Sequence, residues 1–365
     1  MNPDSDGRAT DTPRPLPRAP LGRSAAWTTP LAFGGAGVGN LFRAIDDEEA
    51  ARVLKCAWDE GFRTYDTAPH YGLGLSERRL GDALRTHPRD AYTLSTKVGR
   101  VLEPLPAPHG DDLAAGGFAV HATHRRRQDF TADGVRRSLE DSLGRLGLDR
   151  VDIVYLHDPD DHERQALDEA YPALEQLRAE GVVKAIGVGM NQSAMPTRFV
   201  RDTDIDVVLL AGRYTLLDQS ARDDLLPQAL RRHVSVVAGG VFNSGLLAAP
   251  RPDSTYDYAT APAHLLRQSL LLQEVCGRHG VPLRAAAARF PLGHPAVAGV
   301  LLGLSSTEQV HDAAAQFRRP VPDAMWRDLK AAASSHACGR PSVSGCDGGP
   351  RQGAGRCRPR YGKRR

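Results

Sequence analysis

Four residues with acid–base or hydrogen-bonding side chains stand near the ends of apolar runs: Asp66, Tyr71, Lys97 and His157. Lys97 lies inside the apolar run TLSTKVG, where a buried ammonium is costly unless a carboxylate pairs with it. Asp66, near the end of FRTYDTA, is the expected partner. The positive charge beside the Tyr71 phenol is expected to lower its pKa from the usual value of about 10. With a hydrogen bond from His157, these groups indicate proton transfer at a carbonyl or an alcohol.

Eight repeats of an apolar run followed by an amphipathic segment carry these residues. The apolar runs are residues 31–39, 62–68, 91–99, 151–157, 182–189, 205–217, 234–242 and 297–304. Runs rich in Val, Ile and Leu predict parallel strands covered on both faces, and eight units in about 285 residues predict a single-domain (β/α)8 TIM barrel. A doubly wound open sheet is the alternative, but GGAGVG (34–39) lacks the GxGxxG spacing. In a barrel the four candidate residues meet at the C-terminal rim.

Composition and charge narrow the class of protein. The chain has 365 residues, of which 41% are hydrophobic and 25% charged, so a sizeable packed core is expected. No stretch reaches the roughly 18–20 apolar residues of a membrane helix, and the N-terminus shows no secretory signal. Residues 336–365 contain seven Arg and one Lys but only one acidic residue. The formal net charge of the rest of the chain is therefore near −4. We therefore expect neither a membrane nor a nucleic-acid partner.

The two ends of the chain differ in composition from its body. We predict a disordered arm over residues 1–25, the barrel domain over 26–335 and a disordered basic tail over 336–365. The tail has two other interpretations, an altered reading frame and a basic arm for polyanions. Cys56 and Cys276 lie in expected helices, and the other three cysteines fall in the tail without CxxC spacing. A reducing cytoplasm and no zinc site are the corresponding expectations.

Two polar runs near the candidate residues are weaker signals. HDPDDH (157–162) contains metal-ligand types, but its Asp–Pro turn does not favour a preformed coordination shell, and we predict no metal. HATHRRR (121–127) is interpreted as a solvated loop, although it lies in a connection that often shapes a substrate pocket. His70, beside Tyr71, has no support for a role of its own.

The four candidates and their surroundings resemble the aldo-keto reductase superfamily over roughly residues 30–330. YDTAPHYGLGLSERRLG (65–81) is similar to the family's Asp and Tyr loop with its Glu-containing helix. TLSTKVG is similar to the Lys strand, and DIVYLHDPD (152–160) to the His strand. The resemblance implies that Tyr71 is the general acid and base, that Lys97 and Asp66 tune it, and that His157 orients the substrate.

Departures from the family pattern indicate a branch. Many members carry Ser-Asn after strand five to hold the nicotinamide carboxamide; here GVGMNQS (187–193) leaves Asn191 or Gln192 as substitutes. Strand seven usually ends with a Tyr stacked on the nicotinamide; here VVAGGVFNSGLL (236–247) leaves Phe242. HDPD, GVGMNQ and GGVFNSG together resemble the branch of D-threo-aldose 1-dehydrogenase, L-fucose, L-galactose and pyridoxal 4-dehydrogenases. That resemblance implies oxidation of a cyclic hemiacetal to a lactone, with hydride passed to a nicotinamide cofactor.

The same resemblance places the adenosine side of the cofactor at GLSSTEQVHDA (303–313). Ser305 stands where NADPH-specific relatives often carry Arg, and Glu308 lies nearby, so NAD is expected over NADP. Backbone amides at this helix start are expected to bind the phosphate. The predicted cofactor contacts are Gly35, Asn191, Gln192, Phe242, Gly303, Ser305, Ser306 and Gln309.

Three functions remain to be compared. The first is an NAD-dependent oxidoreductase acting at C1 of a small aldose, with Tyr71 as the base. The second is an NADPH-dependent reductase of aldehydes or ketones, and the third is a non-catalytic barrel that binds a nucleotide as a regulatory subunit. The complete set of four polar residues favours an enzyme. The sequence specifies neither the particular sugar nor the oligomeric state.

Overall fold

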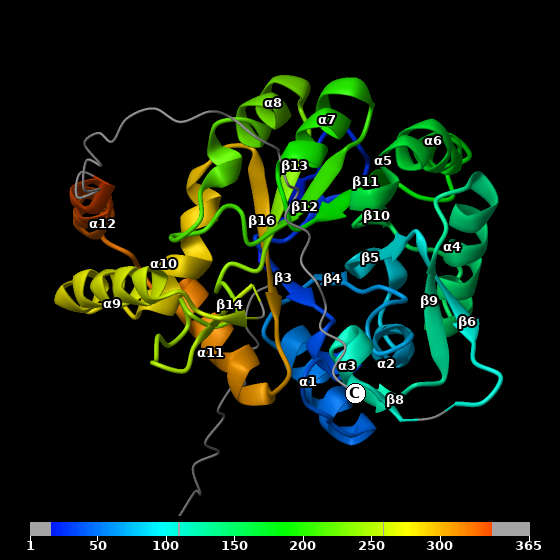
Figure 1. The fold of residues 1–365 in the computed structure, drawn as a ribbon, viewed down its shortest axis with the longest axis horizontal. Helices are drawn as coiled ribbons and strands as arrows, with labels where there is room; N and C mark the ends of the chain where they lie inside the picture. The colour runs from blue at the N-terminus through cyan, green and yellow to red at the C-terminus, as the bar shows by residue number, and fades with distance from the viewer. Residues whose placement is uncertain (1–15, 109, 258, 338–365) are drawn as a thin grey trace, which may run out of the picture.

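A computed structural model describes residues 16–108, 110–257 and 259–337, and eight of its strands form a closed parallel barrel (Figure 1). In chain order these strands are β3 (Leu31–Gly34), β4 (Thr64–Asp66), β5 (Thr93–Val98), β10 (Ile153–His157), β11 (Ala185–Met190), β12 (Val207–Ala211), β13 (Ser235–Gly239) and β16 (Val297–Gly303). Each strand pairs with the next one along the chain, and β16 closes on β3. The predicted (β/α)8 barrel is confirmed.

Helices cover the outside of the barrel and follow the strands in turn. They are α1 (Asp47–Asp59), α2 (Leu75–Leu84), α4 (Ala132–Leu146), α6 (Tyr171–Ala179), α7 (Ala194–Asp202), α8 (Leu225–Arg232), α10 (Leu283–Arg289) and α11 (Thr307–Arg318). Two more, α9 (Ala263–Arg278) and α12 (Asp323–Ala337), pack against each other on one flank (Figure 1). Several helices begin at a residue whose side chain caps the N-terminus. At the start of α1, for example, the Asp46 side chain accepts a hydrogen bond from the Glu49 backbone amide. No helix within the described residues is both long and apolar enough to cross a bilayer.

The alternation of side chains along the strands divides the core into two parts. Outward-facing residues such as Phe33 pack under the helices in one large cluster. Inward-facing residues fill the barrel: Leu21, Ala26, Ile153, Tyr155, Ala185, Val207, Leu209 and Val237. Because the interior is packed, it leaves only the ends of the barrel for binding.

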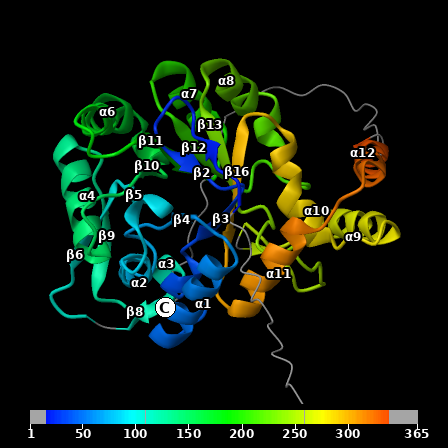
Figure 2. The same cartoon turned by 180° about the vertical axis from the view of Figure 1, so that it is seen from behind.

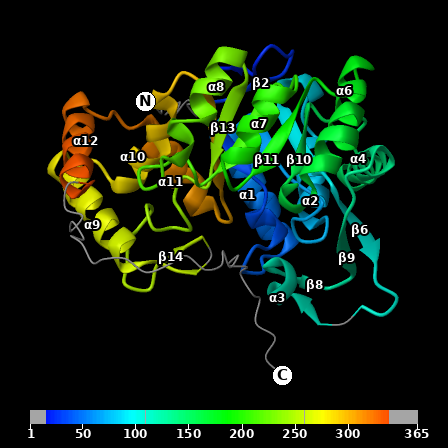
Figure 3. The same ribbon diagram turned by 45° about the horizontal axis from the view of Figure 1, so that its top comes forward.

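The N-terminal end of the barrel is closed by a segment that we predicted to be disordered. β1 (Ala19–Pro20) pairs antiparallel with β2 (Trp27–Thr28), and Leu21 between them is 0% exposed. β2 lies at the end of the barrel opposite β8 (Phe118–His121) and α3 (Leu113–Gly116) (Figure 2 and Figure 3). The predicted arm is therefore wrong for residues 16–25, because Leu21 fills the barrel floor. Residues 1–15 and the predicted tail from residue 338 lie outside the described residues.

The long connection after β5 forms an ordered wall beside the other end. β6 (Arg100–Pro104) pairs with β9 (His124–Gln128), and β7 (Asp111–Asp112) pairs with β8 (Phe118–His121) around the short α3 (Leu113–Gly116). The interpretation of HATHRRR as a solvated loop is wrong, because its last four residues lie in β9. Arg126 from that strand bonds to the 3%-exposed carboxylate of Asp112.

Three further short elements are α5 (Glu163–Gln165), β14 (Thr255–Tyr256) and β15 (Ala259–Thr260).

Candidate active site

Asp66 and Lys97 form a buried ion pair at the C-terminal rim of neighbouring strands. The last residue of β4, Asp66, has Ser95 as its partner in register, so Lys97 lies one step further toward the mouth. The Lys97 ammonium donates to Asp66 Oδ2 at 2.5 Å, to the Thr67 carbonyl at 3.0 Å and to Tyr71 Oη at 3.1 Å. All three of its protons are thereby used, which offsets the cost of burying the charge.

A tight turn after β4 presents the Tyr71 hydroxyl to that ammonium. The Tyr71 amide donates to the Ala68 carbonyl at 3.0 Å, and the Ser76 amide at the start of α2 donates back to the Tyr71 carbonyl. Gly72 has a φ of +61°, and a Cβ there would lie 2.2 Å from the Gly39 carbonyl oxygen. Only glycine fits this position, which explains the YGLG sequence locally.

His157 completes the group from the end of β10. Its ring centroid lies 6.0 Å from that of Tyr71, with the planes at 89°. Burial, followed by the charges of Arg100 and Lys97, holds the pKa of His157 well below its usual value of 6.5. The imidazole is therefore neutral and has one N–H to donate. The structure brings all four sequence-predicted residues together.

The expected direction of the Tyr71 pKa is wrong for this arrangement. Burial raises the pKa of Tyr71 above its usual value of 10, and this exceeds the lowering by Lys97. The carboxylate of Asp66 also raises it. The sequence indicated the Lys97 ammonium but not how deeply the Tyr71 phenol is buried. This burial decides whether the pKa of Tyr71 is raised or lowered. Tyr71 is thus a protonated phenol at neutral pH.

In the opposite half of the barrel mouth, the described strands end in glycine or alanine on the inward face. The last inward-facing positions on β11, β12, β13 and β16 are Gly189, Ala211, Gly239 and Gly303. A Cβ added at Gly303 would meet no atom within 4 Å, and one at Gly189 would come 3.6 Å from Lys97 Cε. These residues leave a cradle beside the polar group that larger side chains would fill, so the mouth fits a flat ring such as a nicotinamide.

The predicted cofactor contacts after strands five and seven have different surroundings in the structure. Asn191 is exposed, and its carbonyl accepts from Arg213 at 2.7 Å. The amide oxygen of Gln192 accepts from the Met195 backbone at 2.9 Å, so this side chain caps α7. Phe242 is partly buried between the main core cluster and the α9–α12 cluster. These contacts stay predictions.

The other predicted contacts lie around α11 and the first turn after β3. The amide of Ser305 donates to the Gln309 side chain at 2.8 Å, and Ser306 Oγ caps α11. A Cβ on Gly35 would lie 2.6 Å from Ser76 Oγ and 2.8 Å from the Asp66 carbonyl oxygen, so its close approach is to the chain itself. A cofactor role for Gly35 also stays a prediction.

Residues that sequence analysis did not select line the wall beside the polar group. Phe118 of β8 lies 6.0 Å from the Tyr71 ring and 5.2 Å from the His70 ring, measured between centroids. Arg100 of β6 bonds to Asp158 at 2.6 Å. The HDPD run was the one sequence signal for Asp158, whereas nothing in the long connection indicated which residues reach the site.

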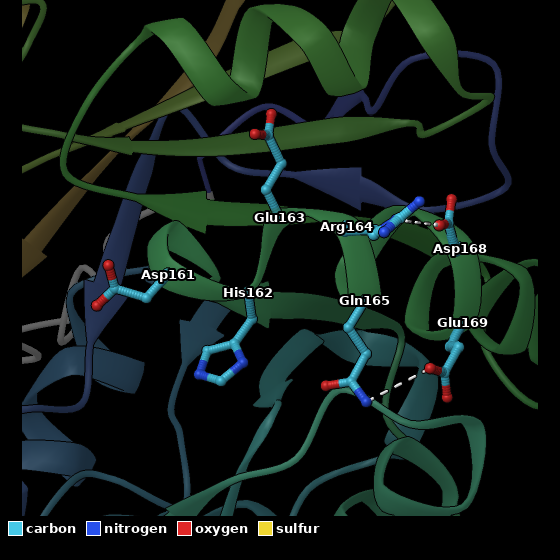
Figure 4. Close-up of a pocket in the computed structure, with 7 residues that line it drawn as sticks. All are labelled: Asp161, His162, Glu163, Arg164, Gln165, Asp168 and Glu169. Atoms are coloured by element: carbon cyan, nitrogen blue, oxygen red, sulfur yellow. Dashed lines mark hydrogen bonds and ion pairs between the residues drawn. The ribbon is translucent and has the colours of Figure 1, made fainter.

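A surface depression beyond β10 does not include the four candidates. It is lined by Asp161, His162, Glu163, Arg164, Gln165, Asp168 and Glu169 (Figure 4). Its side chains pair locally, as Arg164 does with Asp168 at 3.8 Å. No group of three or more His, Cys, Asp or Glu residues in the described part of the chain is placed to hold a metal ion. The depression has the character of a solvated, charged surface.

Comparisons with known proteins agree with the fold. A family model described as "Aldo/keto reductase family" matches residues 30–334. The chain therefore belongs to the aldo/keto reductase family. As an NAD(P)-dependent oxidoreductase it is an enzyme, and the alternative of a non-catalytic regulatory barrel is set aside.

Curated relatives agree with the predicted branch. The chain is 49% identical to a D-threo-aldose 1-dehydrogenase from a Pseudomonas species over 304 residues, which are 82% of this chain and 92% of the relative. It is 39% identical to a pyridoxal 4-dehydrogenase from Microbacterium luteolum over 328 residues, 85% of this chain and 95% of the relative.

Solved structures share the fold. A glycerol dehydrogenase from Gluconobacter oxydans superposes with a TM-score of 0.70 at 22% identity, over 90% of this chain and 99% of that chain. The holo form of an aldo-keto reductase from Bacillus halodurans gives 0.69 at 25% identity, over 87% and 96%.

Proposed function

We propose that this protein oxidises C1 of a small aldose, in its cyclic hemiacetal form, to a lactone and passes the hydride to NAD. The observation that carries the proposal is the Lys97 ammonium, which bridges the buried Asp66 carboxylate and the Tyr71 hydroxyl at the barrel mouth. The 49% identity to a relative named D-threo-aldose 1-dehydrogenase supports the substrate class. The cytoplasm remains the compartment that we predict.

In this mechanism Tyr71 removes the proton of the C1 hydroxyl while C1 loses its hydrogen as hydride. The bound nicotinamide supplies the chemistry of hydride acceptance. Lys97 stabilises the phenolate that must form first, because its ammonium already donates to Tyr71 Oη at 3.1 Å. The neutral His157 donates a hydrogen bond to the same substrate oxygen and orients it. The C1–O bond becomes the lactone carbonyl, and the proton lost from oxygen stays on Tyr71.

The residues that hold the cofactor in this proposal fall into two groups. Gly189, Gly239 and Gly303 leave room for the nicotinamide ring. The first turn of α11, capped by Ser306, offers backbone amides to a phosphate. Residues 303–311 contain no Lys or Arg, and Glu308 is exposed there, so a 2′-phosphate would find no cationic partner in this segment. This supports NAD over NADP.

A panel assay tests the proposed function. Reduced nicotinamide is followed at its absorbance maximum with aldoses, pyridoxal and simple alcohols, each with NAD and with NADP. We expect the highest kcat/KM for an aldose with NAD, and a lactone as the product. Turnover of alcohols or pyridoxal without any aldose oxidation would contradict the proposal.

One observation favours a second candidate, the reduction of aldehydes or ketones. Burial keeps Tyr71 protonated at neutral pH, which suits a proton donor to a carbonyl oxygen. The same panel run with aldehydes and reduced cofactors distinguishes the two directions. A kcat/KM for aldehydes that exceeds every aldose value even at pH 9, where more of Tyr71 is deprotonated, selects the reductase.

A further inference from the structure

Unpartnered polar atoms gather on one side of the barrel mouth. Among the described residues eight buried side-chain nitrogens or oxygens lack a hydrogen-bond partner, and four of them belong to His70, Arg100, Arg126 and His157. These residues are neighbours: the rings of His70 and His157 lie 5.6 Å apart, and Arg126 donates to the His70 carbonyl at 3.0 Å. Folded proteins pair nearly all such atoms, so this wall is polar beyond what the fold needs.

Asp158 carries a negative charge on this wall and is held in an unusual backbone conformation. Its φ is +44°, in the left-handed region that non-glycine residues seldom adopt. The Asp158 amide donates to the Gly189 carbonyl at 3.0 Å, and Arg100 bonds to Asp158 Oδ2 at 2.6 Å. The first contact fixes the backbone of Asp158, and the second fixes its carboxylate. Strained residues of this kind concentrate at functional sites.

The carboxylate of Asp158 lies beside the His157 ring, which orients the substrate oxygen in the proposed mechanism. Asp158 Oδ2 is 3.7 Å from His157 Nε2, too long for a strong hydrogen bond between them. No hydrogen bond within the described residues ends on Asp158 Oδ1. An ionised carboxylate only accepts hydrogen bonds, so its complement on a ligand is a hydrogen-bond donor, which on a sugar is a hydroxyl.

We propose that Asp158, held by Arg100, accepts a hydrogen bond from the C2 hydroxyl of the aldose and so determines specificity for sugars. The inference rests on the proposed function. The proposal places the C1 oxygen between Tyr71 and His157 and turns the hydroxyl of the adjacent carbon toward Asp158, whose carboxylate lies 3.7 Å from His157 Nε2. A site built to bond a hydroxyl rejects analogues without it, because its buried polar group is then unpaired. Asp158 thus separates aldoses from simple hemiacetals.

Two substitutions and two substrates form the test. Asp158→Asn keeps the shape and tolerates the positive φ, and Asp158→Gly removes the side chain at no backbone cost. Each is assayed in the full-length enzyme with an aldose and with its 2-deoxy analogue. Hydrogen bonds to charged groups predict a roughly 10- to 100-fold loss of kcat/KM for the aldose and less than a roughly 3-fold loss for the 2-deoxy sugar. The Asn variant is expected to lose less than the Gly variant.

Glu103→Gln is the matched control. Glu103 forms ion pairs with Arg125 and Arg127 on the same β6–β9 hairpin, but it projects from the strand face opposite to that of Arg100. Its loss is expected to leave the ratio of aldose to 2-deoxy kcat/KM unchanged.

The outcomes separate this inference from the function on which it rests. Equal losses on both sugars in the Asp158 variants, or no loss on either, overturn the inference alone, since a structural role through His157 affects both substrates alike. Failure of the wild-type enzyme to oxidise any aldose overturns the proposed function, and the inference falls with it.

Discussion

The ammonium nitrogen of Lys97 lies 3.1 Å from the hydroxyl oxygen of Tyr71. Burial lowers the pKa of Lys97, but the charges of Asp66 and Tyr71 raise it more, and the net direction is upward. Lys97 therefore stays charged over the pH range of an assay. The phenol opposite it is the group that titrates.

The pH dependence of oxidation follows from this arrangement. Oxidation needs the phenolate of Tyr71, and burial sets the pKa of that group above 10. We expect kcat/KM for aldose oxidation to rise with pH up to at least pH 9, whereas carbonyl reduction stays level there because it uses the phenol. Initial rates in both directions between pH 6 and pH 10 test this. An oxidation rate that levels off near pH 7 disagrees with it.

Asp66→Asn tests two roles of the Asp66 carboxylate: its pairing with Lys97 and its effect on the pKa of Tyr71. The substitution leaves Lys97, which is 2% exposed, without its carboxylate, so we expect the free energy of unfolding to fall by about 3–5 kcal/mol. It also removes a charge that raises the pKa of Tyr71, so the rising limb of the pH profile shifts to lower pH.

Urea unfolding and the pH profile of the purified variant provide the two readouts. Asp47→Asn is the control, because Asp47 pairs with Arg79 but its side chain is 85% exposed. Its effect on stability is expected to stay below about 1 kcal/mol. Equal effects of the two substitutions speak against a special role for the buried pair.

The barrel could be predicted from the sequence because each strand and helix repeats the same local pattern. The grouping of the four polar residues could also be predicted, because the C-terminal ends of all barrel strands lie at one rim. Lys97 is the clearest case: an ammonium in an apolar strand requires a partner, and the next strand supplies Asp66.

The remaining features depend on contacts between distant segments. Leu21 was assigned to a disordered arm because its neighbours include Pro and Arg. In the structure Leu21 is buried in the barrel floor, and this burial holds the neighbouring residues in place. Arg126 was taken as solvated because three arginines in a row indicate a surface, and pairing with β6 places it against Asp112. The Tyr71 pKa depends on burial, which composition and spacing do not report.

Cofactor preference is expected to follow one position. Ser305 is the residue before the cap of α11, and introducing Arg there supplies a cation for a 2′-phosphate. Ser305→Arg should lower the Kd for NADP by about 10-fold relative to NAD, as fluorescence titration measures. Gln165→Arg, on the charged depression, adds the same charge elsewhere and should leave the ratio unchanged. An NADP preference in the wild type runs against the assignment.

His70 is expected to destabilise the fold in acid. Burial, with the charges of Arg100 and Arg126, lowers the pKa of His70 to about 2. The unfolded chain binds the proton near pH 6.5, so the free energy of unfolding falls as pH drops below 6.5 toward 2.

The loss of unfolding free energy that comes from His70 is at most roughly 1.4 kcal/mol per pH unit. His70→Phe removes this pH-dependent loss. Urea unfolding of wild type and variant at pH 7.0 and pH 5.0 measures the difference. Identical losses of stability in both proteins are incompatible with a buried neutral His70.

Turnover of a Tyr71→Phe variant, measured together with its Kd for the cofactor, tests the central claim most directly. The substitution keeps the ring and removes only the hydroxyl that Lys97 contacts. We predict an unchanged Kd and a kcat lower by about 100- to 10,000-fold, the contribution of a general acid or base. A kcat within a few-fold of the wild type would show that another group moves the proton and would contradict the mechanism.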